Sequence, residues 1–347
     1  MFNPADWLHS GQDAVVAGLR LRPRPHPQSR HLPLATSMGQ AAVFYLDGDG
    51  QREWMLKKFH PGRAPDAAYV AAIRSLVPRE AGFESGSERR CLIGSMVSSA
   101  GYTAHDFVAW IEGTILMPRV RASAWSDFLG ELRDGTIDLD VPARLGIAED
   151  FCKKVEALEA GRVAHRDLSA TNVMLDDEHA IHFIDWDSLY APSLRMPANT
   201  TIGTNGYTAP YMREAGDDPR ASWTAGADRF ALAVLVLETF AAQRGCAFTG
   251  DGCLLEQEEI HARRGLTLDA ATAAAGARAK DVIPLFAKAL AAKTPRECPG
   301  PRQWFRALKR SRPRRARAAA RPQPGFVSLD RGMFVSLDRS RFVGLTR

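Results

Sequence analysis

The sequence predicts an α+β fold in which strands come first and helices follow. Residues 34–46 and 52–59 are strand-like, and the tetrapeptide DGDG at 47–50 between them is a strong signal for a β-hairpin. Ala143 to Leu158 repeats apolar residues at helical spacing, and Phe230 to Leu237 is an unbroken apolar run. A β-rich N-terminal part and a mainly helical C-terminal part are therefore expected.

Length and composition are typical of a folded, soluble protein. A chain of 347 residues with 45% hydrophobic and 24% charged residues is long enough for two packed lobes. Its longest apolar run is far shorter than the roughly 20 residues of a membrane helix, and its N-terminus lacks the features of a secretory signal. Five cysteines without close metal-type pairs fit reduced thiols. We expect a cytoplasmic protein without membrane contact, and the abundant alanine, arginine and glycine indicate a bacterial one.

Positive charge is concentrated at the end of the chain. From Arg310 onward there are ten arginines and two aspartates, so the remaining residues carry about −3 of the total charge of +5. Residues 310–325 are predicted to form a disordered basic Pro/Ala linker, and residues 326–347 a tail with a period-eight repeat. The linker is a candidate for nucleic-acid contact, although such runs are more often only solubilising. The repeat either adds to a sheet edge or has no function.

Residues 1–33 are expected to be an irregular leader. A short helix is a candidate at 13–19, and the prolines and arginines of LRPRPHPQSRHLP preclude regular structure after it. The first regular structure is therefore expected at the hairpin that begins at residue 34.

A polar stretch in the middle of the chain predicts a site for phosphoryl transfer. His165 to Asp187 is expected to form a loop, then two strands joined by an acidic turn, and a final acidic segment. Its hairpin would gather Asp167, Asn172 and Asp185 around one point. Phosphoryl transfer needs a base for the attacking hydroxyl and oxygen ligands for Mg²⁺, and these three side chains supply that set. The alternative is a capped turn whose polar side chains only satisfy backbone donors.

These residues resemble the protein kinase superfamily. The HRD triplet at 165–167 with Asn172 is similar to the kinase catalytic loop, and the DWD triplet at 185–187 stands where kinases have Asp-Phe-Gly. The resemblance implies a two-lobed protein-kinase-like fold, with a small β-rich lobe at 34–113 and a larger, mainly helical lobe at 114–309. ATP and Mg²⁺ would bind between the lobes.

The resemblance also assigns roles to individual side chains. It implies that Asp167 is the base, with Arg166 beside it, and that Asn172 and Asp185 hold Mg²⁺. Lys57, in the stretch WMLKKF, matches the kinase lysine that contacts the ATP phosphates. The alternative for Lys57 is a solvated lysine at the end of a strand.

Further ATP contacts follow from the resemblance with weaker signals. Gly39 is the single glycine left of the loop that covers the phosphates, and Val43 stands where a valine covers the adenine. The apolar stretch FVAWIEG, residues 107–113, is expected to be the strand that joins the lobes. Val108 would then line the adenine pocket, and the backbone of Ala109 to Ile111 would hydrogen-bond the base.

The sequence does not identify an acidic partner for Lys57. Residues 66–76 are expected to form a helix like the first regulatory helix of kinases, but this helix contains no glutamate. Glu80 and Glu84 are candidates, and neither is assigned.

Later motifs favour the kinase resemblance. Residues 203–210, GTNGYTAP, resemble the end of the kinase activation segment. Asp228 and the apolar run after it resemble the buried helix whose aspartate caps the backbone of the catalytic loop. Residues 285–308 are similar to the closing helices of a kinase lobe.

The chain departs from the kinase pattern at several positions. Ser169 replaces a lysine that touches the transferred phosphate, which predicts slow turnover, if any. Asp187 replaces a glycine and is a candidate for a further Mg²⁺ ligand. Tyr211 and Cys298 stand where kinases have the two partners of a buried ion pair. Because both charged residues are replaced, neither is left buried without a partner.

Arg166 is typical of kinases that are switched by phosphorylation of the activation segment, because the new phosphate pairs with arginine. Thr200 is then the expected site of autophosphorylation, with Thr201 second. The alternative is that Arg166 only packs against the segment.

The sequence thus predicts an ATP- and Mg²⁺-dependent phosphotransferase, a divergent serine/threonine protein kinase with an unidentified protein substrate. A small-molecule kinase of the aminoglycoside or choline kinase type is one alternative; it shares an Ile-Asp-Trp motif but lacks the match at 203–210. A pseudokinase that acts as a scaffold is another. Ser169 and the poor glycine loop favour it, whereas the retained lysine, base and Mg²⁺ ligands argue against it.

Overall fold

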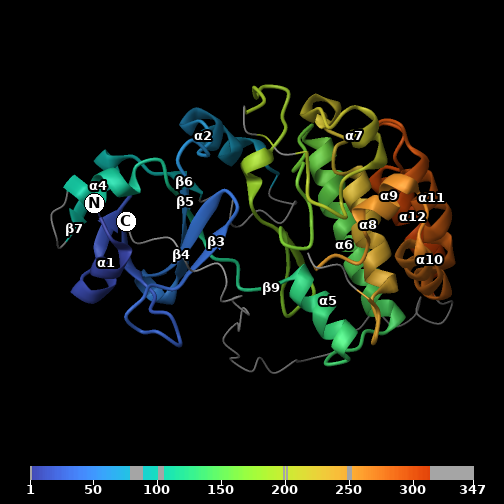
Figure 1. Cartoon of the computed structure of the whole chain (residues 1–347), viewed down its shortest axis with the longest axis horizontal. Helices are drawn as coiled ribbons and strands as arrows, with labels where there is room; N and C mark the ends of the chain where they lie inside the picture. The colour runs from blue at the N-terminus through green and yellow to red at the C-terminus, as the bar shows by residue number, and fades with distance from the viewer. Residues whose placement is uncertain are drawn as a thin grey trace.

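The computed structural model describes residues 2–78, 89–100, 105–197, 200, 202–247 and 252–312. A curled antiparallel sheet lies at one end of the molecule, and most of the helices lie at the other end (Figure 1). The α+β class predicted from the sequence is therefore confirmed. We call residues 2–118 the sheet part and residues 119–312 the helical part.

The two parts contain the following elements. In the sheet part the strands are β1 (Ala14–Val16), β2 (Leu19–Pro23), β3 (Ala35–Met38), β4 (Ala41–Gly48), β5 (Glu53–Phe59), β6 (Arg90–Cys91), β7 (Val97–Ala100) and β8 (Ile115–Pro118). Its helices are α1 (Pro4–Ser10), α2 (Ala67–Leu76) and α4 (His105–Ile111), with 3-10 turns η1 (Asp49–Gln51) and η3 (Gly94–Met96). The helical part has strands β9 (Ser123–Ala124), β10 (Val173–Leu175) and β11 (Ile181–Phe183). Its helices are α5 (Trp125–Asp134), α6 (Val141–Ala160), α7 (Pro210–Glu214), α8 (Arg229–Ala241), α9 (Gln257–Ala262), α10 (Leu266–Ala279), α11 (Ile283–Ala291) and α12 (Pro301–Ser311), with 3-10 turns η4 (Trp186–Ser188), η5 (Pro219–Ser222) and η6 (Lys280–Val282).

The large sheet is built around the hairpin predicted from the sequence. Its strands run in the order β6-β8-β5-β4-β2-β1-β7, and β3 pairs separately with β4. β4 and β5 are antiparallel partners over seven residue pairs from Ala41–Phe59 to Asp47–Glu53. Gly50 adopts φ 66° in the turn between them, a left-handed conformation that glycine accepts without a steric penalty. The predicted hairpin is confirmed.

The N-terminal residues are not an irregular leader, which corrects the expectation for 1–33. Asn3 caps α1, and β1 and β2 form a hairpin that extends the large sheet. The candidate helix at 13–19 is wrong as well, because this stretch contains β1. Trp7 of α1 is fully buried within the core of the sheet part, where its ring contacts that of Phe107. Strands of three to five residues show too few alternations to be recognised, and here pairing with longer strands decides the structure.

The expected strand at 107–113 is wrong: these residues belong to α4. Phe107 and Ile111, one helical turn apart, are both fully buried in the core of the sheet part. Gly113 ends the segment with φ 71°, and the strand follows as β8, which lies between β5 and β6. A short apolar run fits a helix and a buried strand equally well, and the sequence does not distinguish them. The boundary expected between 113 and 114 therefore falls before the last strand of the sheet.

The helix expected at 66–76 is present as α2. The Asp66 carboxylate caps it by accepting the backbone N–H of Ala68 at 2.7 Å. Tyr69 and Ile73 point into the core of the helical part, and the Tyr69 hydroxyl donates to the carbonyl of Leu189 at 2.5 Å. α2 is thereby tied to the chain that follows the acidic DWD triplet.

The helical part is organised around α8. Every residue from Phe230 to Ala241 is buried, as expected for a helix that is apolar on all sides. α6 packs against α8 and matches the predicted amphipathic helix at 143–158, and the predicted closing helices at 285–308 are present as α11 and α12. No helix in the described ranges is long and apolar enough to cross a bilayer.

Candidate active site

A short hairpin presents the polar residues singled out by the sequence. β10 pairs antiparallel with β11, and the Asp176 carboxylate closes the turn by accepting the N–H groups of Glu178 and Ala180 at 3.0 and 2.8 Å. The chain enters this hairpin through residues 165–172 and leaves it through residues 185–187. The predicted loop-hairpin-loop arrangement is confirmed, and it brings the two polar segments to the same end of the hairpin.

Asp228 holds the first of these segments in place. Its two carboxylate oxygens accept the backbone N–H groups of His165 and Arg166, each at 2.7 Å. Asp228 is buried, and burial raises its pKa to about 6 although the two amides favour the charged form. Arg166 adopts a left-handed backbone with φ 69°, which the two hydrogen bonds and the side-chain contacts of Arg166 stabilise. The predicted contact between Asp228 and this loop is confirmed.

His165 links the two polar segments. Its ring lies 4.6 Å from the Trp186 ring, and Nε2 makes a 2.7 Å hydrogen bond with the carbonyl of Ile184. Nδ1 accepts the backbone N–H of Asp167 at 3.3 Å, which fits a neutral ring with its proton on Nε2. Burial lowers the pKa of His165 to about 4, so the ring stays neutral. His165 is therefore a structural connection between the segments and carries no charge into the site.

Asp167 is held by two side chains. Asn172 Nδ2 donates to the Asp167 carbonyl at 2.8 Å and to Oδ2 at 3.2 Å, while Thr204 Oγ1 donates to Oδ1 at 2.8 Å. Burial raises the pKa of Asp167 to about 6, against the two hydrogen bonds. The carboxylate is thus oriented by donors on both of its oxygens.

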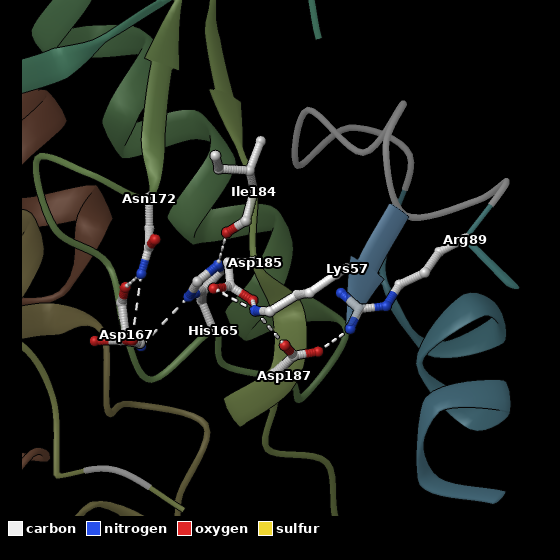
Figure 2. Close-up of polar contacts among 8 residues, drawn as sticks. All are labelled: Lys57, Arg89, His165, Asp167, Asn172, Ile184, Asp185 and Asp187. Atoms are coloured by element: carbon white, nitrogen blue, oxygen red, sulfur yellow. Dashed lines mark hydrogen bonds and ion pairs between the residues drawn. The ribbon is translucent and has the colours of Figure 1, made fainter. Parts of the chain in front are cut away.

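Lys57 crosses from the sheet part to the second polar segment (Figure 2). Its Nζ lies 2.7 and 2.8 Å from the two oxygens of Asp185 and 2.6 Å from Oδ2 of Asp187. Burial opposes ionisation of Asp185, but the Lys57 ammonium outweighs it and holds the pKa of Asp185 below its usual range. Lys57 is buried, which excludes the alternative of a solvated lysine.

Arg89 completes a cluster that the sequence did not reveal. It is buried just before β6, and its guanidinium donates to Oδ1 of Asp187, as Figure 2 shows. Both oxygens of Asp187 are thereby used, one by Arg89 and one by Lys57. Arg89 has no motif around it, so no signal in the sequence pointed to this contact. Glu80 and Glu84, the candidate partners of Lys57, lie outside the described residues.

Arg166 reaches the segment predicted to be phosphorylated. Its Nη1 donates to Thr200 Oγ1 at 2.7 Å, and its guanidinium also contacts the hydroxyl of Ser222 at 3.0 Å and packs over the Trp223 ring. Thr201, the second expected acceptor, lies outside the described residues. Arg166 therefore both packs against the segment and holds the hydroxyl of Thr200.

Gly39 and Val43 lie on the strands next to Lys57. Gly39 occupies the two-residue turn between β3 and β4, and Val43 is the cross-strand partner of Lys57. Val43 is buried. The β3–β4 hairpin therefore lies beside the strand that carries Lys57.

The residues expected to contact adenine are not positioned for that role. Val108, Ala109 and Ile111 belong to α4, where Val108 accepts the N–H of Glu112 within the helix turn and packs beside Gly94. Their backbone groups are engaged in helix geometry, so they do not offer a strand edge to a base. The chain passes from the sheet part to the helical part through residues 119–122 instead, directly after β8.

The polar side chains fit the ligand chemistry of Mg²⁺. Asp185 offers carboxylate oxygens, and the Asn172 amide directs its nitrogen at Asp167, which leaves its oxygen for a cation. Among the described residues no three His, Cys, Asp or Glu side chains form a metal-binding group. A Mg²⁺ ion held by Asp185 and Asn172 would therefore take its other ligands from water and phosphate, as Mg²⁺ commonly does.

Two departures from the kinase pattern have clear structural outcomes. Ser169 is buried, and its hydroxyl lies 3.1 Å from that of Thr171, so it supplies no cation. Tyr211 and Cys298 are both buried, and the ion pair that the kinase pattern has there is replaced by a nearby one. Arg229, on α8, donates to both oxygens of Glu159, on α6, at 2.7 and 2.9 Å.

A cavity of about 590 Å³ lies between α2 and residues 193–197. Asp187 and Thr200 line it, whereas Asp167, Asn172 and Lys57 do not. The size of this cavity therefore does not indicate a nucleotide site. The proposed chemistry rests on the polar side chains described above.

Comparison with known proteins finds partial similarity to plant receptor-like kinases. The chain is 29% identical over 138 residues to a proline-rich receptor-like protein kinase of Arabidopsis thaliana, which covers 38% of this chain and 19% of that protein. It is 33% identical over 108 residues to an L-type lectin-domain containing receptor kinase of the same plant, which covers 29% of this chain and 15% of that protein. A G-type lectin S-receptor-like serine/threonine-protein kinase is 29% identical over 117 residues, 32% of this chain and 13% of that protein.

The chain thus spans less than a fifth of the length of these curated relatives. No protein-family model matches it. The similarity indicates kinase-like relatedness over about a third of the chain.

Proposed function

We propose that this chain is an ATP- and Mg²⁺-dependent phosphotransferase with a two-lobed protein-kinase-like fold, in which the sheet part and the helical part are the two lobes. The observation that carries the proposal is the meeting of Lys57 and Asp185, which lie 128 positions apart. A lysine from a sheet and a carboxylate from a loop in the helical part form the phosphate and Mg²⁺ ends of a kinase site. Kinase-like relatedness supports the same conclusion.

Each polar side chain has a role in this proposal. ATP with Mg²⁺ would supply the transferable phosphoryl group and neutralise the charge on its oxygens. Asp185 and Asn172 hold the cation, and Lys57 holds the phosphates. Asp167 orients the hydroxyl of the acceptor and takes its proton, with Thr204 and Asn172 fixing the direction of its carboxylate.

The proposed acceptor is a serine or threonine hydroxyl of a protein. Residues 203–210 support this choice because they form an ordered segment whose Thr204 touches Asp167. Adenine would lie near residues 119–122, which replace 107–113 as the segment between the two lobes.

A non-catalytic scaffold is the second candidate, and Ser169 is the observation that favours it. Where a lysine would stabilise the transferred phosphate, the chain has a buried hydroxyl paired with Thr171. Loss of such a cation typically costs a few kcal/mol of transition-state stabilisation. A scaffold would bind nucleotide without transferring phosphate.

Labelled ATP tests the proposed function. The purified full chain is incubated with γ-labelled ATP and Mg²⁺ in the presence of generic protein acceptors or a panel of amino sugars. We expect label on protein, lost in Asp167→Asn and in Asp185→Asn. Asp177→Asn is the matched control, because Asp177 is an exposed aspartate in the turn of the same hairpin.

Each result that differs from this expectation has its own interpretation. Labelling of amino sugars without protein labelling would make the chain a small-molecule kinase. ATP binding with no transfer to any acceptor would make it a scaffold. Label that persists in Asp167→Asn alone would contradict the role of Asp167 as the base, and label that persists in both variants would show that it comes from a contaminating kinase.

A further inference from the structure

Helix α2, which resembles the first regulatory helix of kinases, contains no acidic residue that could pair with Lys57. In kinases a glutamate of the first regulatory helix pairs with the lysine. α2, AAYVAAIRSL, contains neither aspartate nor glutamate, and its capping residue Asp66 is used by the N–H of Ala68. The buried face of α2 instead carries Tyr69, Val70 and Ile73. A lysine that is to stay ionised in a buried site must find its partner elsewhere.

Asp187 is that partner by geometry. Lys57 Nζ lies 2.6 Å from Oδ2 of Asp187, as close as its contacts with the two oxygens of Asp185 at 2.7 and 2.8 Å. An ammonium group has three donors. If Asp185 turns one oxygen to a cation, and if the phosphates take one donor of Lys57, the contact with Asp187 still holds the lysine in position.

Local backbone structure aims both carboxylates at Lys57. Asp185 adopts a left-handed conformation with φ 60° and directly precedes the 3-10 turn η4. Trp186, between the two aspartates, is buried and donates from Nε1 to the carbonyl of Phe183 at 3.1 Å. Because this indole anchors the turn in the core, Asp185 and Asp187 both point toward the sheet part.

Arg89 distinguishes Asp187 from Asp185. Its guanidinium donates to Oδ1 of Asp187 while Lys57 donates to Oδ2, so two cationic side chains already compensate the charge of Asp187. The four side chains Lys57, Arg89, Asp185 and Asp187 also balance two positive against two negative charges. Lys57 and Arg89 are the buried members, and each has a carboxylate partner, which is the condition on which a buried charge is tolerated.

We propose that Asp187 is the positioning residue for Lys57, in place of a helix glutamate, and that Arg89 fixes Asp187 in that role. This inference rests on the proposed function, since the position of Lys57 matters for its contact with phosphate. It separates the two aspartates of the DWD triplet: Asp185 serves the cation and Asp187 serves the lysine. The lysine is then held by the same loop that holds the cation, and α2 contributes no charge to its placement.

Nucleotide binding by the full chain tests the positioning role. Displacement of a fluorescent ATP analogue by ATP gives the dissociation constant with and without Mg²⁺. Asp187→Asn is expected to weaken ATP binding about tenfold, the range of one lost charged hydrogen bond. Asp187→Glu should restore most of that affinity and Arg89→Met should lose part of it. In Lys57→Met, the further change Asp187→Asn should have no additional effect, because the group it positions is gone.

Steady-state kinetics measures a quantity that a purely structural role of Asp187 would not change. Asp187→Asn should raise KM for ATP and leave KM for the protein acceptor unchanged. The control is Glu159→Gln, which breaks a partly exposed ion pair in the helical part and should lower stability without changing ATP affinity.

A urea-denaturation cycle without nucleotide distinguishes this inference from the proposed function. Lys57→Met and Asp187→Asn should be non-additive in the free energy of unfolding, because the residues contact each other. If the two substitutions are non-additive but Asp187→Asn leaves ATP affinity unchanged, the positioning role is wrong and the proposed function still stands. If the wild-type chain binds no ATP although the two residues are coupled, the proposed function fails and the positioning role fails with it. Additive effects would overturn the pairing itself.

Discussion

The hydroxyl of Thr204 donates a hydrogen bond to Oδ1 of Asp167 over 2.8 Å. The same threonine accepts, through its carbonyl, the hydroxyl of Thr208 at 3.0 Å. Through these contacts, the segment that resembles the end of a kinase activation segment is attached to the proposed base. The state of the segment and the orientation of the base are therefore coupled.

Replacing Thr204 tests that coupling. Thr204→Val keeps the shape of the side chain and removes its hydroxyl, so Asp167 loses one of its two orienting side chains. We expect the rate of phosphoryl transfer to fall about tenfold or more, the range for a hydrogen bond to a charged group. Thr204→Ser is the matched control and should retain most of the rate in the same labelled-ATP assay. Equal loss in both variants would contradict a role for the hydroxyl.

Thr200 is the expected acceptor of a regulatory phosphate. Its Oγ1 already lies 2.7 Å from Nη1 of Arg166, so a phosphate there would gain charge-assisted hydrogen bonds. Mass spectrometry after incubation with ATP should find phosphate on Thr200, and the modified chain should melt at a higher temperature. Thr200→Ala should remove this gain and Thr201→Ala should keep it. Phosphate confined to Thr201 would contradict this prediction.

The ion pair between Arg229 and Glu159 should stabilise the helical part. The pair joins α8 to α6 by two hydrogen bonds at 2.7 and 2.9 Å, with each side chain about a fifth to a quarter exposed. We expect Arg229→Met and Glu159→Gln each to lower the free energy of unfolding by about 1 to 2 kcal/mol. The double variant should lose less than the two single losses combined, as measured by urea denaturation. Fully additive losses would contradict a direct contact.

Glu238 should make stability depend on pH. It is fully buried on α8, and its carboxylate accepts hydrogen bonds from Trp125, Tyr207 and the backbone N–H of Leu254. Burial raises the pKa of Glu238 to about 7 from an ordinary value of 4.5, although these donors oppose the shift. Between these two pH values the folded chain keeps a proton that the unfolded chain releases. The contribution of Glu238 to stability is therefore full below about pH 4.5 and is lost as pH rises through about 7.

The corresponding measurement compares two proteins at two pH values. Urea denaturation of the wild type at pH 5 and pH 8 should show a loss at the higher pH, of which Glu238 accounts for on the order of 1 to 3 kcal/mol. Asp167 and Asp228 also have raised pKa values, so the wild type alone does not isolate Glu238. Glu238→Gln does not titrate and should lose less stability between these pH values. An identical pH dependence in both proteins would contradict this role for Glu238.

Much of the arrangement was predictable from local sequence. The hairpin at 173–183, the DGDG turn at 47–50, the buried helix after Asp228 and the capped helix after Asp66 all have patterns that repeat within a few residues. The polar residues around that first hairpin could be recognised as a set because they lie close together in sequence. Short-range periodicity and turn chemistry were sufficient for these elements.

Other elements were mispredicted because their signals are short or ambiguous. The three-residue strand β1 forms only because it pairs with β2 and β7. The apolar stretch at 107–111 could have been strand or helix, and burial of Phe107 and Ile111 against α1 and the sheet made it a helix. The adenine contacts expected from that stretch failed for the same reason. Local propensity does not specify which face of a short apolar run will be buried.

By itself, the sequence determined which chemical groups are available: the aspartate proposed as the base, two oxygen-bearing side chains of the kind that Mg²⁺ prefers, a lysine, and a helix α2 without an acid. Only the tertiary structure decided which of these groups meet. Lys57 and Asp187 are 130 positions apart, and Arg89 and Asp187 are 98 apart. Contacts over such separations depend on how the sheet part packs against the helical part, and on every buried charge finding a partner there. No local pattern carries that information, because a charged residue has the same local signature whether its partner is in solvent or in another part of the fold.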